Sequence, residues 1–321
     1  MKQLKGIALG TFPFANVFGK IDEHTASQIL RQYIEYGGEF IHVSLVYNNG
    51  AVEELLGKEL KKYPRDSYKI MACCGWSMNN GVTKLSGKKE DVEACCNGAL
   101  QRLGLDHLDV LMSHAPDSQT PFEETIDAMD RLKRAGKCSE LCVSNVSLEM
   151  LKRYNYSGAV NYIQNRFSLL NQSLSKELID YCTGNDIKIT TYQTVERGLL
   201  SDRVIKGLDF TATDLRAKKP EFAESIQSEI GKWISKEIKP IANDEGVPVL
   251  SLVLRWTLQN QPINAILCGI SKPAYFSDYL SVAKDMLSTE TIARINQAYD
   301  KFSSYIEEKY QKSIRAFMGL A

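Results

Sequence analysis

Polar side chains that can donate, accept or exchange protons follow directly on short apolar runs of this sequence. Histidine can act as a general acid or base, tyrosine can donate a proton, and cysteine can act as a nucleophile. Any one of these residues could simply cap a helix, but a set gathered at one face predicts a catalytic site. The set consists of Thr11, His42 with Tyr47 just beyond it, Cys73, His114, Ser144 and Asn145, Gln164, Tyr192, and Ser271.

The elements that must position these residues alternate along the chain. Apolar runs typical of buried parallel strands occupy 7–11, 40–45, 68–73, 108–113, 140–144, 162–164, 188–192 and 263–268. Helical patterns separate them, at 24–36, 52–60, 91–103, 122–135, 148–154, 174–181 and 249–258. This alternation predicts an α/β fold of the (β/α)8 TIM-barrel type, with the active site at the C-terminal face of the strands. A Rossmann domain with a second domain is the rival, but no G-x-G-x-x-G follows the first strand.

We predict a single barrel domain over 1–321 with two additions. Residues 202–246 interrupt the alternation, and an insertion of this length at the C-terminal face is typical of a lid. Residues 300–321 predict a helical tail that packs outside the barrel or borders the pocket. The segment 76–89 is expected to be a loop that contributes to substrate specificity. Trp76 within it is interpreted as packing or pocket wall rather than chemistry.

The composition excludes several classes of partner. The 321 residues carry 39 basic and 39 acidic side chains, so we expect no nucleic-acid partner. The sequence contains no apolar stretch of about 18 residues and no signal-peptide pattern, which favours a cytoplasmic protein without a membrane partner. The eight cysteines include no C-x-x-C pair and are expected to be reduced, mostly buried thiols. We assign no oligomeric state from the sequence.

A metal site is the alternative use of three of the candidate residues. His42, Cys73 and His114 would form a His2Cys ligand set for zinc or copper if their side chains converged. We expect no metal, because suitable ligand types without known distances are weak support for a site.

Eight ordered segments between about residue 6 and about residue 285 resemble those of the aldo-keto reductase superfamily. They are 40–47 (similar to F-I-D-T-A-x-x-Y), 53–57 (E-x-x-L-G), 102–109 (R-L-G-L-D-x-x-D), 113–117 (I-H-x-P-D), 143–145 (the end of G-V-S-N), 161–164 (V-N-Q), 198–201 (G-L-L-T) and 269–273 (G-A-R-N-P).

The resemblance implies NAD(P)-linked reduction of an aldehyde or ketone by a tetrad of Asp, Tyr, Lys and His. Tyr47 and His114 match two members, whereas His42 stands at the Asp position and Cys73 at the Lys position. Losing one charged partner would leave a buried charge unpaired, at a cost of about 3–5 kcal/mol, so the paired change is interpreted as a re-tuned site. Without the cation, the pKa of Tyr47 is expected near its ordinary value of about 10. Our hypothesis is that a protonated His42 partly replaces the lost charge.

The resemblance also implies a nicotinamide pocket. Ser144, Asn145 and Gln164 match residues that hold the carboxamide in the family, and Tyr192 matches the aromatic that stacks on the ring. The loop 195–200 matches the one that covers the pyrophosphate.

The adenine end of the implied cofactor site is mixed. Ser271 and Tyr275 replace the usual family residues, but Lys272 can contact a 2′-phosphate as a point charge. NADP or NAD is therefore expected, with NADP slightly favoured. The residues expected to bind the cofactor are Gly10, Thr11, Ser144, Asn145, Gln164, Tyr192, Gly198, Leu199, Ser271, Lys272, Tyr275 and Asp278.

Three functions fit the residues. The first is an NAD(P)-dependent oxidoreductase that acts on a small carbonyl or alcohol substrate with a modified tetrad. The second is a non-redox or redox-neutral enzyme (a lyase, dehydratase or epimerase) that uses His42, Tyr47 and His114 as acid/base groups, with Cys73 as a nucleophile only if a neighbour stabilises its thiolate. The third is a pseudoenzyme that binds a dinucleotide.

Overall fold

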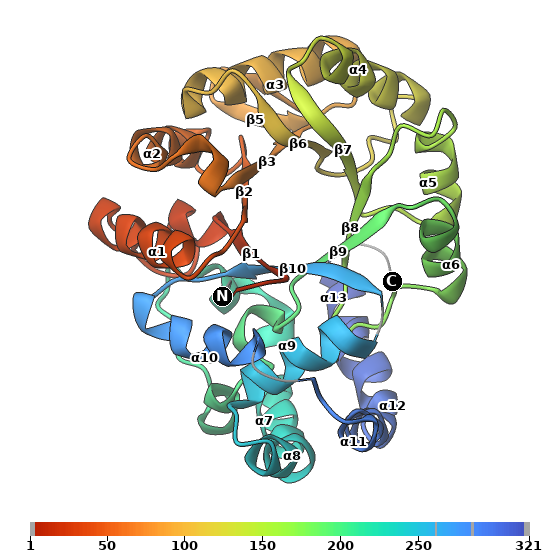
Figure 1. Cartoon of the computed structure of the whole chain (residues 1–321). Coiled ribbons are helices and arrows are strands. Elements are labelled where there is room, and N and C mark those ends of the chain that lie inside the picture. Colours follow the sequence, from red (N-terminus) through yellow and green to blue (C-terminus); the bar gives the residue numbers. More distant parts are fainter. Residues whose placement is uncertain (1–3, 261, 284–285, 318–321) are drawn as a thin grey trace.

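The computed structural model of the chain describes residues 4–260, 262–283 and 286–317. Parallel strands close into a barrel in the order β1-β10-β9-β8-β7-β6-β3-β2, with helices around it (Figure 1). The predicted (β/α)8 barrel is confirmed, and each predicted apolar run forms one barrel strand. The strands are β1 (Ile7–Gly10), β2 (Phe40–Ser44), β3 (Lys69–Cys74), β6 (Leu108–Ser113), β7 (Cys138–Ser144), β8 (Tyr162–Arg166), β9 (Lys188–Tyr192) and β10 (Ile263–Gly269).

The strand register places the candidate residues at one rim. Ser44 pairs with Cys73 across β2 and β3, and Ser144 pairs with Gln164 across β7 and β8. Because parallel strands all end at the same face, the residues that follow them meet there. His114 comes directly after β6, so it belongs to the same rim.

The outer ring of helices is amphipathic. In α1 (Glu23–Glu35) the buried residues include Ala26, Ile29, Leu30 and Tyr33, at the spacing that faces one side of a helix. The Tyr33 hydroxyl lies within hydrogen-bond distance of two carbonyls, 2.9 Å from that of Ile7 in β1 and 2.8 Å from that of Phe40 in β2, so its one proton is shared between them. The other helices of the ring are α2 (Ala51–Leu60), α3 (Lys89–Leu103), α4 (Phe122–Arg134), α5 (Leu148–Tyr154), α6 (Lys176–Gly184) and α9 (Val249–Asn260).

The segment 76–89 is not the simple loop that we predicted. It contains an antiparallel hairpin of β4 (Trp76–Asn79) and β5 (Val82–Leu85). Asn80 and Gly81 form the turn, both with positive φ, of 49° and 77°. An Asn-Gly pair is the strongest short-range hairpin signal in a sequence, because it tolerates this backbone. The hairpin holds Trp76 at the rim of the barrel.

The two predicted additions are mainly helical. The 202–246 insertion contains short 3-10 helices, then α7 (Glu224–Trp233), a π-helical turn (Ile234–Ile238) and α8 (Lys239–Asp244). After α10 (Phe276–Leu280) and α11 (Thr289–Asp300), the tail comprises α12 (Ser303–Tyr305), a π-helical turn (Ile306–Gln311) and α13 (Lys312–Phe317). The end of the predicted tail, 318–321, lies outside the described residues.

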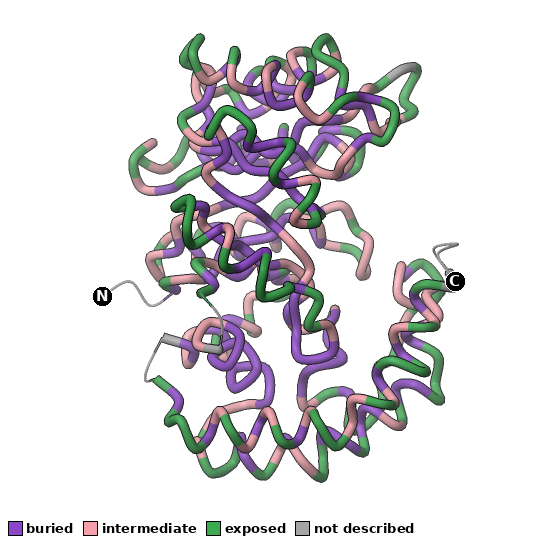
Figure 2. The backbone as a smooth tube through the Cα atoms, turned by 90° about the vertical axis from the view of Figure 1, so that its right-hand side faces the viewer, coloured by how far each residue is buried: buried purple, intermediate pink, exposed green. Residues whose placement is uncertain are grey.

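Most of the buried residues lie on the strands and on the inner faces of the helices (Figure 2). A separate apolar cluster fills part of the barrel interior and includes Met71, Cys73, Val110, Met112, Cys142 and Tyr162. All eight cysteines are buried free thiols, as the sequence predicted. In the part of the chain that the structure describes, no helix combines the length and hydropathy needed to cross a bilayer.

Candidate active site

The His42 ring lies between a thiol and a phenol. Its Nε2 is 3.2 Å from Cys73 Sγ, and its Nδ1 is 3.5 Å from the Tyr47 hydroxyl oxygen. Thr11 supports this residue from behind, because its hydroxyl donates to the His42 carbonyl over 2.8 Å. The structure thus brings the two unusual tetrad positions into a chain of contacts that ends at Tyr47.

His114 completes the cluster from β6. Its ring centroid lies 6.3 Å from that of His42 and 6.3 Å from that of Tyr47. The Trp76 indole N–H donates to His114 Nδ1 over 3.0 Å, and Ser44 Oγ lies 3.1 Å from the same nitrogen. These contacts fix the orientation of the imidazole.

Burial controls the protonation of both histidines. Burial, and then the neighbouring His114, lower the pKa of His42 to about 3. Burial alone lowers the pKa of His114 to about 4. Both rings are therefore neutral near pH 7, which contradicts our hypothesis that a protonated His42 partly replaces the lost charge. Among the described residues, no carboxylate contacts the His42 ring to offset the cost of burying an imidazolium.

The same environment keeps the two acids protonated. Burial raises the pKa of Cys73 well above its ordinary value, and hydrogen bonding by Ser44 opposes this only in part. Burial, with Cys73 and Tyr192 nearby, raises the pKa of Tyr47 well above 10. The pKa of Tyr47 thus lies further from that of a free phenol than the sequence predicts. A thiolate nucleophile at Cys73 has no support here, since His42 is neutral and the thiol is fully buried.

Four residues expected at the nicotinamide end do lie together. Asn145, with φ of 60°, donates from Nδ2 to the His114 carbonyl and to Ser144 Oγ, both over 3.1 Å. The Tyr192 hydroxyl donates to Asn145 Oδ1 over 2.6 Å. Gln164 Nε2 lies 3.7 Å from the sulfur of Met71, deeper in the barrel.

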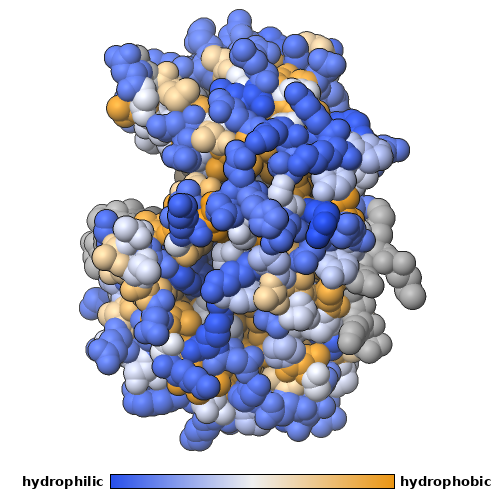
Figure 3. Space-filling view, turned by 90° about the vertical axis from the view of Figure 1, so that its left-hand side faces the viewer, coloured by the Kyte–Doolittle hydropathy of each residue, from blue (hydrophilic) through white to orange (hydrophobic). Residues whose placement is uncertain are grey.

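Two cavities adjoin at this face and form one groove. The first, about 410 Å³, is lined by Gly10, His42, Tyr47, Trp76, His114, Ser144, Asn145, Gln164 and Tyr192, among others. The second, about 450 Å³, continues from it, since both share Phe18, Val195, Arg197 and Gly269. In Figure 3 the surface is hollowed on one side, between the upper part that carries α3 and α4 and the lower part that carries α7 and α8.

The second cavity is basic. Arg203 Nη1 donates to the Tyr275 hydroxyl over 2.8 Å, and its guanidinium lies 4.6 Å from the centroid of that ring. Lys272 approaches the same ring, with Nζ 5.9 Å from the centroid. The predicted residues Gly198, Ser271, Lys272 and Tyr275 line this cavity together with Arg203, Lys206 and Arg216 from the 202–246 insertion.

The tail secures the loop between the two cavities. Glu196 is buried and accepts hydrogen bonds from Arg166 Nη2 over 2.6 Å and from the Tyr310 hydroxyl over 2.9 Å. Arg197, next to it, has φ of 51° and lines both cavities. The buried side of the tail therefore holds a wall of the groove.

Four predicted site residues do not lie in the groove wall. Cys73 is fully buried behind His42, and Thr11 is fully buried beneath the same residue. Leu199 packs in the hydrophobic core, because burial removes its apolar side chain from water. Asp278 lies on α10, where its backbone carbonyl accepts hydrogen bonds from the hydroxyls of Ser251 and Ser281.

Sequence reasoning missed several groove residues. Trp76, interpreted as packing or pocket wall, does line the groove, and its indole N–H also donates to the candidate catalytic His114. Arg203 and Arg216 lie in the insertion, where only a lid was foreseen. The Asn80-Gly81 turn signal and the basic residues of the insertion were the available clues.

Within residues 4–260, 262–283 and 286–317, no group of three His, Cys, Asp or Glu side chains is arranged to hold a metal ion. The chemistry of the groove fits a dinucleotide instead. One end offers amide and hydroxyl groups beside the aromatic ring of Tyr192, and the other offers guanidinium and ammonium groups that suit phosphates.

The fold and the groove together define a single-barrel protein with a nucleotide-sized site at the carboxyl ends of its strands. The family model "Aldo/keto reductase family" matches residues 6–300. The chain belongs to this family.

Several proteins similar to this chain have names consistent with the aldo/keto reductase family. Aldo-keto reductase YhdN of Bacillus subtilis is 28% identical over 294 residues, covering 90% of this chain and 88% of its own. The NADH-specific methylglyoxal reductase of Escherichia coli is 26% identical over 279 residues, covering 83% and 84%. The glycerol dehydrogenase AKR11B4 from Gluconobacter oxydans shares the fold, with a TM-score of 0.84, 23% identity and coverage of 93% and 92%.

Proposed function

We propose that the protein is an NAD(P)-dependent oxidoreductase that reduces a small carbonyl compound to an alcohol. The observation that carries this proposal is the shared cavity: Tyr47 and His114 open on the same space as the carboxamide-binding candidates Ser144, Asn145 and Gln164. A nicotinamide held by these residues would supply the hydride. Two of the relatives are named as reductases, one of them for methylglyoxal, so a small carbonyl of this kind is the first substrate to test.

His114 is proposed to orient and polarise the carbonyl. Because its Nδ1 accepts the Trp76 indole N–H and the ring is neutral, the ring proton must reside on Nε2. Nε2 is then the nitrogen that can donate to the substrate oxygen. Trp76 acts as a positioning residue, since it selects this tautomer.

Tyr47 is proposed to give its proton to the oxygen that becomes the alcohol. The pKa of Tyr47 is high, but an alkoxide is more basic still, because an alcohol is a weaker acid than a phenol. The forward proton transfer is therefore favourable, whereas the reverse reaction starts from a buried tyrosinate that no cation contacts among the described residues. The forward step leaves that same tyrosinate, which must regain a proton before the next turnover.

His42 and Cys73 are proposed to supply a neutral substitute for the missing ion pair. If the thiol donates to Nε2, then Nδ1 carries the proton and faces the Tyr47 oxygen, where it can stabilise the phenolate formed during turnover. A neutral donor at 3.5 Å stabilises an anion less than an adjacent ammonium does. We expect a slower reductase than one that has the ion pair.

One observation favours a second candidate, a dinucleotide-binding protein without turnover: no cation in the described structure contacts Tyr47. Two measurements separate the candidates. NADPH and NADH are titrated by fluorescence, and turnover is then recorded with methylglyoxal and longer aldehydes, using wild type and Tyr47→Phe. Binding with turnover that falls at least about a hundredfold in the variant supports the reductase. Binding without turnover establishes the second candidate, and an unchanged rate in Tyr47→Phe refutes the proposed proton donor.

A further inference from the structure

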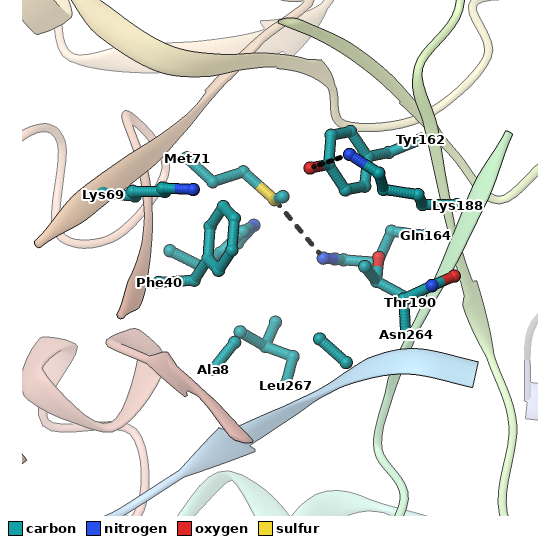
Figure 4. A pocket seen from close by; sticks show the side chains of 12 residues that line it. Ala8, Phe40, Lys69, Met71, Tyr162, Gln164, Lys188, Thr190, Asn264 and Leu267 are labelled. Atoms are coloured by element: carbon teal, nitrogen blue, oxygen red, sulfur yellow. Dashed lines mark hydrogen bonds between the residues drawn. The ribbon is translucent and has the colours of Figure 1, made fainter. Parts of the chain in front are cut away.

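A third cavity lies inside the barrel, toward the amino ends of the strands. Its volume is about 250 Å³, and Figure 4 shows the side chains that surround it. It shares only its inner end with the groove, through His42, Gln164 and Leu267, which line both spaces. The mouth is formed by residues at or next to the start of a strand, so it lies at the face opposite Tyr47 and His114. The mouth residues are Phe40, Lys69, Tyr162, Lys188 and Asn264.

The alternation of the strands explains this arrangement. Side chains two residues apart point to the same side of a strand, so in β2, β3, β8 and β9 the residue two positions after the mouth residue also lines the cavity. Lys69 is followed in this way by Met71, and Lys188 by Thr190. The barrel interior thus has a charged outer layer and a largely apolar inner layer on this side.

The mouth presents positive charge. Among the described residues that line the cavity there are two lysines and no carboxylate. Lys188 Nζ lies 3.3 Å from Glu140 Oε1 and donates to the Tyr162 hydroxyl over 3.2 Å, so its charge is partly balanced from outside the lining. Lys69 is exposed, with Nζ 5.1 Å from the centroid of the Phe40 ring. Both ammonium groups can donate to an anion at the mouth.

The inner walls are suited to an apolar body. Met71, Ala8, Ala265 and Leu267 contribute carbon and sulfur surfaces, with Thr190 and Gln164 as the polar groups beyond them. An engineered cavity of about 150 Å³ is large enough to bind benzene. A space of about 250 Å³ therefore has room for a ring of that size with a carboxylate attached.

We propose that this cavity binds a small organic monocarboxylate, with the carboxylate between Lys69 and Lys188 and the apolar body against Met71 and Leu267. The site is separate from the dinucleotide groove, and the proposal stands whether or not the chain is a reductase. An occupant would reach the underside of His42 and Gln164, the two polar residues common to both spaces.

Calorimetric titration of the full chain with benzoate tests the proposal, with benzamide as the uncharged control. Benzoate should bind, and benzamide should bind at least about tenfold more weakly, because it lacks the charge that the lysines recognise. Lys69→Met should weaken benzoate binding about tenfold. Lys152→Met is the matched control, since Lys152 is also exposed and lies 5.8 Å from an aromatic centroid, but on an outer helix.

Two further arms locate the bound molecule. Ala265→Leu fills the cavity and should abolish binding, with the melting temperature recorded to establish that the variant is folded. Saturating NADPH should leave benzoate affinity unchanged. The proposal is overturned if benzoate does not bind, if Lys69→Met binds it as wild type does, or if NADPH or Tyr47→Phe removes the binding, which would place benzoate in the groove.

Discussion

Nδ1 of His42 lies 3.5 Å from the hydroxyl oxygen of Tyr47, and both side chains are buried. The Tyr47 proton therefore has a neutral imidazole as its neighbour in place of an ion pair. This relationship determines how strongly the phenol of Tyr47 can act as an acid, and therefore how fast a carbonyl can be reduced.

Restoring the ion pair should raise the reduction rate. We expect the double variant His42→Asp with Cys73→Lys to increase kcat/KM about ten- to a hundredfold, because an adjacent ammonium stabilises the phenolate formed from Tyr47. The exchange shortens one side chain and lengthens the other, which limits overpacking. Steady-state kinetics with a substrate turned over by wild type provide the measurement.

The two single variants are the control for this prediction. Each leaves one buried charge unpaired, at a cost of about 3–5 kcal/mol, so each should be less stable and less active than the double variant. Equal effects of the single and double variants on rate and melting temperature would argue against coupling between positions 42 and 73.

Stability should fall in mild acid because of the two buried histidines. Their pKa values in the folded protein, about 3 for His42 and about 4 for His114, lie below the unfolded value of about 6.5. The unfolded chain therefore binds more protons below pH 6.5, and stability present above that pH is lost as the pH falls toward 4. The slope from the two groups is at most about 2.7 kcal/mol per pH unit.

Urea unfolding between pH 7 and pH 4 measures this slope. His42→Gln should remove about half of the histidine contribution, whereas the exposed His24→Gln is the control that leaves it in place. The interpretation fails if both variants retain the wild-type dependence.

Loss of the Trp76 N–H should affect chemistry more than folding. Trp76→Phe keeps an aromatic ring but leaves His114 Nδ1 without its indole donor, so the tautomer that serves the substrate is less favoured. We expect kcat to fall about tenfold with little change in dinucleotide affinity. Trp233→Phe is the matched control: its indole donates to the Ala298 carbonyl, and its loss should lower the melting temperature alone.

Arg203 should contribute to the choice of dinucleotide. It lies with Lys272 beside Tyr275 in the basic cavity, where an additional phosphate would find two cations. Arg203→Met should weaken NADPH binding about tenfold and NADH binding much less. Fluorescence titration with both dinucleotides checks this, and Arg153→Met, on an outer helix, should change neither affinity. Equal losses for both dinucleotides would assign Arg203 to a phosphate that they share.

The sequence by itself determined the barrel and the membership of its rim. Strand and helix periodicities are local properties, and in a parallel barrel they place Tyr47, His114 and Asn145 at one face whatever the details of packing. The Asn80-Gly81 hairpin is equally local, because the turn pair that favours it is present in the sequence itself.

Only the tertiary structure decided how these residues behave. Whether His42 is charged depends on burial by many residues distant in sequence, and burial makes it neutral. The Trp76–His114 contact and the cavity beneath His42 likewise arise from side chains of separate strands that meet inside the barrel. Residue type and spacing establish which groups are present, whereas protonation and cavity shape follow from packing in three dimensions.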